Sequence, residues 1–139
     1  MRTLAPLVLV AVLAACGGTG EDFAEKAIAI CEETNAEIRA LGAPESFADT
    51  QLYASRAKDA VADGIDALND LSPPTELAKE FDLYLVTLEE RTLLLERLGD
   101  AADERSINAV RDAGSRIAEL DDTAREQAKK IGIEACEPR

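Results

Sequence analysis

The sequence predicts an all-α fold, a single antiparallel up-down-up-down four-helix bundle that follows an N-terminal signal segment. Apolar residues recur at steps of three and four along four segments after residue 20, with glycine or proline between the segments. No segment shows the strict alternation of apolar and polar residues that is typical of a β-strand. Short loops between helices of similar length favour antiparallel packing of sequence neighbours.

The first two helices are expected over residues 21–41 and 47–71. Gly42 can end the first helix in a left-handed conformation, and Pro44 prevents its continuation. Ser72-Pro73-Pro74 ends the second helix, and Ser72 is a candidate cap for the third. The inward positions of these two helices are Phe23, Ala27, Ile30, Cys31, Thr34, Ile38 and Leu41, then Tyr53, Ala57, Ala60, Val61, Gly64, Leu68 and Leu71.

The third helix is expected over residues 75–98, closed by Gly99, and the fourth over residues 104–131, closed by Gly132. Their inward positions are Leu77, Phe81, Tyr84, Leu85, Leu88, Thr92, Leu95 and Leu98, then Ile107, Val110, Gly114, Ile117, Leu120, Ala124, Ala128 and Ile131. A chain of this length suits one domain with one core.

The first fifteen residues have the features of a secretory signal. Arg2 supplies a positive charge, and residues 4–15 are apolar with one proline. A helix of twelve residues spans about 18 Å, well short of a hydrocarbon core of about 30 Å. Leu13-Ala14-Ala15-Cys16 resembles the lipobox of bacterial lipoproteins. The resemblance implies cleavage before Cys16 and a thioether-linked diacylglycerol on its Sγ. An ordinary signal cleaved after Ala15 and an uncleaved apolar N-terminus are the alternatives.

Under the lipoprotein interpretation, residues 1–15 are the signal peptide, residues 16–20 are the lipidated cysteine and a glycine-rich leash, and residues 21–139 form the bundle. Two acyl chains give stable anchoring, so we expect the protein at the cell membrane, on its extracytoplasmic face. The short leash and the Ala-, Asp- and Arg-rich helices are also loosely similar to small uncharacterised lipoproteins of high-GC bacteria. That similarity implies no activity.

The charge of the chain limits its partners. It carries 15 basic and 28 acidic residues, a net charge of −13, and removal of Arg2 with the signal makes this −14. Nucleic acid is therefore excluded as an expected partner, and an anionic bilayer surface would repel the folded part. A cationic or helical protein partner near the membrane, or simple solubility, fits this charge better.

The residues that commonly carry catalysis are scarce. The chain has no histidine, which removes the usual general base and the commonest transition-metal ligand, and it has no Gly-x-Ser-x-Gly motif. Adjacent carboxylates such as Glu89-Glu90 point about 100° apart on a helix and do not converge. We expect no enzyme and no cofactor. An enzyme that uses carboxylates alone is the weakest alternative, and it would need two of them converging in a cleft.

Two surface features offer candidate binding sites. Asp59, Asp63, Asp66 and Asp70 follow one another at steps of four, three and four, which makes a stripe that is a weak candidate for binding a cation. A solvated helix face is the favoured alternative, because calcium usually requires a loop that wraps around it. Apolar residues outside the main seam of the third helix form a candidate docking face for a partner helix or an acyl chain: Leu83, Val86, Leu93 and Leu94. The alternative is a helix packed broadly against two neighbours.

The glycines at inward positions separate two functional hypotheses. Gly64 and Gly114 allow close approach of helices, or they leave room for a ligand. The leading hypothesis is a non-enzymatic interaction or envelope-structural module. The alternative is a carrier of a small apolar or lipidic ligand inside the bundle, which would require an enclosed apolar cavity of several hundred Å³ near these glycines.

The two remaining cysteines predict a disulfide. Once Cys16 carries lipid, Cys31 and Cys136 are the only thiols left, and export places them in an oxidising compartment. Cys31 lies well inside the first helix, so the C-terminal tail must turn back after Gly132, with Ile133 packed inward. A redox or metal-binding pair is less favoured, because the spacing is not Cys-x-x-Cys and no other soft ligand is present.

Overall fold

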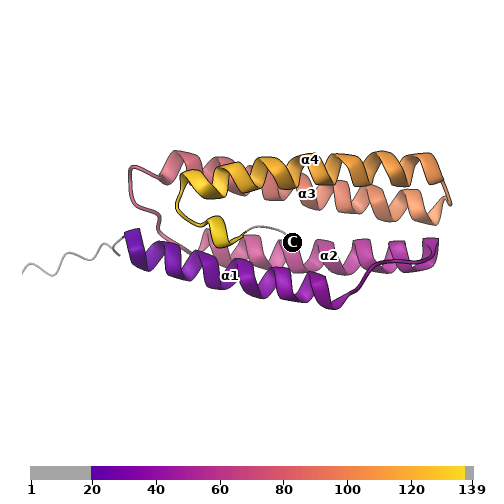
Figure 1. The fold of residues 1–139 in the computed structure, drawn as a ribbon, viewed down its shortest axis with the longest axis horizontal. Helices are drawn as coiled ribbons and strands as arrows, with labels where there is room; N and C mark the ends of the chain where they lie inside the picture. The colour runs from indigo at the N-terminus through magenta and orange to yellow at the C-terminus, as the bar shows by residue number, and fades with distance from the viewer. Residues whose placement is uncertain (1–19, 137–139) are drawn as a thin grey trace, which may run out of the picture.

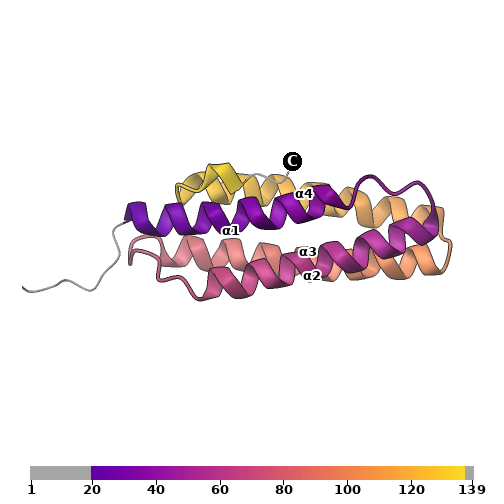
Figure 2. The ribbon, with the colours of Figure 1, turned by 90° about the horizontal axis from the view of Figure 1, so that it is seen from below.

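A computed structural model describes residues 20–136, and the regular secondary structure of this part of the chain is entirely helical. The helices are α1 (Gly20–Ala40), α2 (Phe47–Asn69), α3 (Ala78–Asp103), α4 (Ile107–Lys130) and the short 3₁₀ helix η1 (Glu134–Cys136). The four long helices run alternately up and down along one axis (Figures 1 and 2). The predicted four-helix bundle is therefore confirmed. The predicted signal peptide, Cys16 and most of the leash lie outside the described residues.

The packing of the bundle is uneven around its axis. α2 packs along α3, α3 packs along α4, and α1 packs on α2, but no Cα of α1 lies within 8 Å of one in α4. The η1 helix contacts both α1 and α4, and it occupies the space between them at one end of the bundle (Figures 1 and 2). The C-terminal tail therefore completes a bundle that α1 and α4 leave open.

The core has two parts along the bundle. At the end that holds η1, Phe23 and Phe81 meet edge to face with ring centroids 5.0 Å apart, and Leu68, Ile131 and Ile133 pack around them. At the other end the core is built from aliphatic side chains of α2, two leucines of α3 and one alanine of α4: Ala54, Ala57, Val61, Ile65, Leu95, Leu98 and Ala113. Most of the side chains predicted to point inward are buried or half-buried. Ile107 is 62% exposed, so its predicted inward position is wrong, because it is the first residue of α4 and lies at the end of the bundle.

The end of α3 differs from the prediction. The helix continues through Gly99 to Asp103, so the expected stop at Gly99 is wrong. A Cβ at Gly99 would lie 3.5 Å from the Cβ of Ala54, so the glycine sits within ordinary helix packing. The reversal comes instead at Arg105, which has φ 53°. Ser106 N donates to the Ala101 carbonyl there, a Schellman arrangement that closes α3.

Serine side chains begin two of the helices. The Ser46 hydroxyl accepts from Asp49 N at 3.1 Å at the start of α2, and Ser106 accepts from Ala109 N at the start of α4. These bonds satisfy amide groups that the first turn of a helix leaves free. Ser72 does not cap α3, because α3 begins three residues later than predicted, after Leu77 and without a side-chain cap.

The tail turns back as predicted. Gly132 has φ 77°, a conformation that residues with a side chain rarely adopt, and Ile133 N donates to the Ala128 carbonyl at 2.9 Å. Ile133 is fully buried behind this turn. Gly42 also has the predicted positive φ, 72°, after α1. Among the described helices, none combines the length and the apolar character that a membrane span requires.

Candidate functional site

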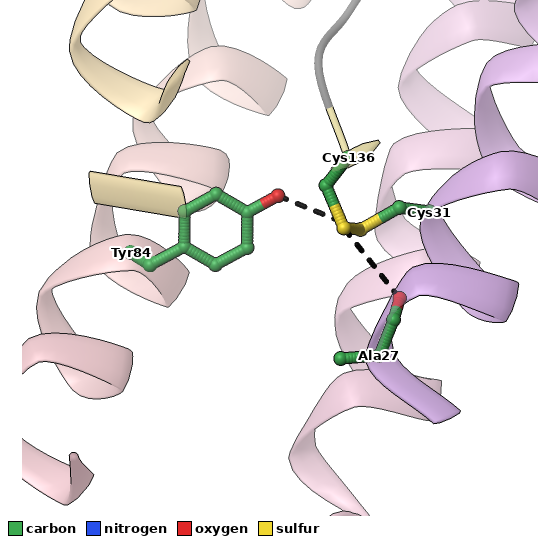
Figure 3. Close-up of a disulfide and its surroundings, with 4 residues drawn as sticks. All are labelled: Ala27, Cys31, Tyr84 and Cys136. Atoms are coloured by element: carbon green, nitrogen blue, oxygen red, sulfur yellow. Dashed lines mark hydrogen bonds between the residues drawn. A yellow bond between two sulfur atoms is a disulfide. The ribbon is translucent and has the colours of Figure 1, made fainter. Parts of the chain in front are cut away.

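The tail is fixed to α1 by a disulfide. Cys31 on α1 and Cys136 on η1 are bonded, with their Cα atoms 5.0 Å apart, which confirms the predicted pair (Figure 3). Both cysteines are buried, at 7% and 4% exposure. The bridge therefore lies beneath the surface of the crevice between α1 and α4, and it holds η1 in place there.

Tyr84 reaches the bridge from α3. Its hydroxyl lies 3.6 Å from Cys31 Sγ, and because a disulfide sulfur carries no proton, the phenol is the donor (Figure 3). Cys136 Sγ lies 3.6 Å from the Ala27 carbonyl, a contact that becomes a hydrogen bond only if the bridge is reduced to thiols. Burial raises the pKa of Tyr84 to about 12, with Arg91 lowering it and Asp121 raising it further. Tyr84 therefore stays protonated and donates at ordinary pH.

An ion pair borders the same crevice. Arg91 Nε on α3 lies 2.8 Å from Asp121 Oδ1 on α4, and the two side chains are only 11% and 23% exposed. Burial raises the pKa of Asp121, although the nearby positive charge of Arg91 lowers it. The pair is largely removed from water, so loss of either partner would leave a costly isolated charge. The pair joins α3 to α4 beside the bridge that joins η1 to α1.

The sequence did not single out this pair as functional. Arg91 lies seven residues after Tyr84, and Asp121 lies three residues before Ala124, so both fall on the inward side of their helices. The sequence signal for this ion pair was one charged residue at an inward, otherwise apolar position on each of the two helices. Local periodicity does not show how α3 and α4 are aligned along each other, and this alignment brings the two side chains together.

The crevice contains a small cavity. It has a volume of about 40 Å³ and is lined from α1, α2, α3, α4 and η1, with the bridge, Tyr84, Arg91 and Asp121 in its wall. This volume suits about one or two water molecules and no larger ligand. A Cβ at Gly64 would lie 2.5 Å from Thr34 Oγ1 across this space. Gly64 therefore permits the close approach of α1 and α2, the first of its two predicted roles.

The chemistry available in the crevice is limited. Asp121 is the only carboxylate in the cavity wall, and it is paired with Arg91. Tyr84 is held in its protonated form, and the buried sulfurs are bonded to each other. The crevice therefore offers no pair of converging carboxylates and no activated nucleophile among its described residues. The arrangement fits a structural clamp.

Two other predicted features lie at the surface. The aspartates of the α2 stripe, Asp59, Asp63, Asp66 and Asp70, are all exposed. Within residues 20–136, no three carboxylate or cysteine side chains lie close enough to hold a metal ion. Gly114 is exposed and has no neighbour within 4 Å of a Cβ placed on it, so its predicted inward position is wrong. The α4 helix turns this position to solvent because it packs on α3 alone along that part of its length.

The predicted docking face of α3 is exposed at three of its four residues. Leu83, Val86 and Leu93 are 45%, 49% and 56% exposed. Leu94 is buried at 7% exposure, so its assignment to this face is corrected. The reason is helical geometry: Leu94 lies about 100° around the helix from Leu93, towards α4.

Two open grooves border this outer face of α3, and Leu93 lines both. The α3–α4 groove has a volume of about 610 Å³, and its charged residues are Glu90, Arg97, Arg116 and Glu119. The α2–α3 groove has a volume of about 320 Å³, and its charged residues are Lys58, Asp66, Glu89 and Glu96. The first is balanced in charge, and the second has three acids against one base.

Scans against protein-family models, curated proteins and solved structures found no match to this chain.

Proposed function

We propose that this chain is an exported, lipid-anchored, non-enzymatic interaction or envelope-structural module on the extracytoplasmic face of the cell membrane. The observation that carries the proposal is the Cys31–Cys136 bridge. Stable disulfides form in oxidising compartments, which supports export. The chain has three cysteines, so the bridge leaves Cys16 alone at the end of the lipobox-like motif.

The position of Cys16 sets how close the bundle lies to the membrane. Four residue steps separate Cys16 from Gly20, where α1 begins, and these span at most about 14 Å. The α3 helix has 26 residues and is about 39 Å long. A lipid on Cys16 would therefore hold one end of the bundle at the membrane surface and leave the grooves along its length accessible.

The non-enzymatic part of the proposal is supported by the chemistry of the crevice. Its titratable groups are engaged in holding helices together, and the remaining carboxylates described above lie on exposed helix faces. The carrier hypothesis has less support, because the cavity beside Gly64 is about 40 Å³ and the larger hollows are open grooves. A lipid or drug-sized ligand needs several hundred Å³.

The anchor is tested by replacing Cys16 in the protein made by its own host. We expect Cys16→Ala to accumulate as an uncut precursor that lacks the acyl mass found on the wild type. Gly18→Ser, a matched change within the leash, should be processed normally. If Cys16→Ala is cleaved and retained by membranes like the wild type, the lipoprotein proposal is wrong.

A further inference from the structure

We propose that the α2–α3 groove is a docking site for a cationic amphipathic helix of a partner protein, with lysine or arginine on both sides of an apolar stripe. The inference rests on the proposed function and names the surface and the partner chemistry of the interaction module.

Exposed apolar side chains concentrate on one face of the molecule. Within residues 20–136, five large apolar side chains are exposed, and three of them lie on the outer face of α3: Leu83, Val86 and Leu93. Leu93 lines the groove together with Ala62 and the buried Ile65 of α2. A partner helix seated there would cover Leu93 and remove apolar surface from water.

The rims of the groove carry unpaired negative charge. Asp66 on α2 and Glu89 and Glu96 on α3 are exposed. Among the described residues, none of the three carboxylates forms an ion pair, and neither does Lys58, the one base in the groove. The aspartate stripe of α2 extends the negative rim along the same helix. This distribution complements a cationic segment.

The neighbouring α3–α4 groove lacks this imbalance. Its lining has two acids and two bases, a formal sum of zero, against three acids and one base in the α2–α3 groove. One of its bases, Arg116, is paired with Asp112 at 3.3 Å, and discounting that base still leaves the larger groove the less negative of the two. The negative rim therefore makes the α2–α3 groove the better surface for a positively charged partner.

The spacing of the acids fits a helix laid along the groove. Glu89 and Glu96 are two turns apart, about 10.5 Å along α3, with Leu93 between them. A partner helix with apolar residues at i, i+3 and i+7 and basic residues beside them would match both features. A second copy of this chain fits poorly, because each copy carries a net charge of −13 and would bring acids against acids. An anionic membrane is disfavoured for the same reason.

The test measures binding of a synthetic helical peptide of leucine and lysine, with leucines at i, i+3, i+4 and i+7. The full chain is kept in solution in a nonionic detergent, with or without lipid on Cys16, and fluorescence anisotropy of the labelled peptide is corrected with detergent alone. A peptide with glutamate at every lysine position is the charge control. We expect the lysine peptide to bind at least tenfold more tightly than the glutamate peptide, and its affinity to fall as salt is raised.

Variants locate the site. Glu89→Gln with Glu96→Gln, and separately Leu93→Ser, should each weaken binding of the lysine peptide about five- to tenfold. Ile107→Ser changes an equally exposed apolar residue of α4, and Glu33→Gln changes an exposed acid of α1, so both should bind as the wild type does. Circular dichroism of each variant establishes that the fold is retained.

Equal binding of the two peptides, or unchanged binding by the groove variants, would overturn the proposal. A wild-type dimer that Leu93→Ser dissociates would assign the face to a second copy and would also overturn it. None of these results depends on lipid at Cys16. The docking proposal and the lipid-anchor proposal can therefore be refuted independently of each other.

Discussion

Removal of the Cys31–Cys136 bridge should cost a large part of the stability of this domain. The two cysteines are 105 residues apart, and closing a loop of that size removes chain entropy worth about 4.7 kcal/mol at 25 °C from the unfolded state. Domains have total stabilities of about 5–15 kcal/mol, so a loss of this size is a large fraction of the whole. At roughly 4 °C per kcal/mol for a chain of this length, the Tm should fall by about 15–20 °C.

The assay is urea unfolding of the full chain with Cys31→Ala and Cys136→Ala, followed by far-ultraviolet circular dichroism. The wild type in the presence of dithiothreitol is the matched control, because reduction removes the same link without changing the residues. We expect the reduced wild type and the double variant to lose similar stability, and reductant to have no further effect on the variant. A loss below about 1 kcal/mol, or a variant much less stable than the reduced wild type, would refute the loop-entropy reasoning.

Three further predictions concern the groups around the bridge. Gly64→Ala should destabilise the fold by about 1–2 kcal/mol in thermal unfolding, although alanine has the better helix propensity, because the new Cβ meets Thr34 Oγ1. Adding Thr34→Ala to the same chain removes that contact and should restore most of the lost stability. Ile133→Ala should cost about 2–4 kcal/mol in urea unfolding, whereas Ile107→Ala, 62% exposed, should change stability by less than about 0.5 kcal/mol. Burial raises the pKa of Asp121 in the fold above its ordinary value of 3.8, so its contribution to stability is present below that value and is lost as pH rises through the folded pKa. The wild type should therefore lose stability relative to Asp121→Asn as pH rises above about 4, and a constant difference between the two would contradict this.

The sequence carried enough information for the helices and the bridge. The 3.6-residue period of the apolar residues predicted the helices, because packing of an apolar face is the main source of helix stability in proteins. The bridge followed from counting cysteines and from Gly132, whose lack of a side chain permits the reversal that brings Ile133 inward.

The errors have tertiary causes. Gly99 was expected to end α3, but packing against Ala54 outweighs the cost of about 1 kcal/mol for a glycine inside a helix. The reversal at Arg105 has no glycine to signal it. Burial of Leu94 beside an exposed Leu93 depends on which side of α3 faces α4, a fact set by the packing of the whole bundle.

The candidate site was only partly predictable for the same reason. The cysteines of the clamp could be named by counting thiols, and the exposed residues of the α3 face could be named from helical spacing. The Arg91–Asp121 pair joins residues 30 positions apart on different helices, and its partners meet through the register between α3 and α4. The open side between α1 and α4, which the tail fills, could not be read from any single helix.

Mass spectrometry of unreduced peptides from the protein purified out of its host membranes tests the lipoprotein proposal most directly. It reads the state of all three cysteines in one measurement. We predict an N-terminal peptide that begins at Cys16 and carries a diacylglycerol, and one cross-linked pair that contains Cys31 and Cys136. An unmodified Cys16 within an intact precursor, or a Cys16 bridged to either of the other cysteines, would contradict the proposal.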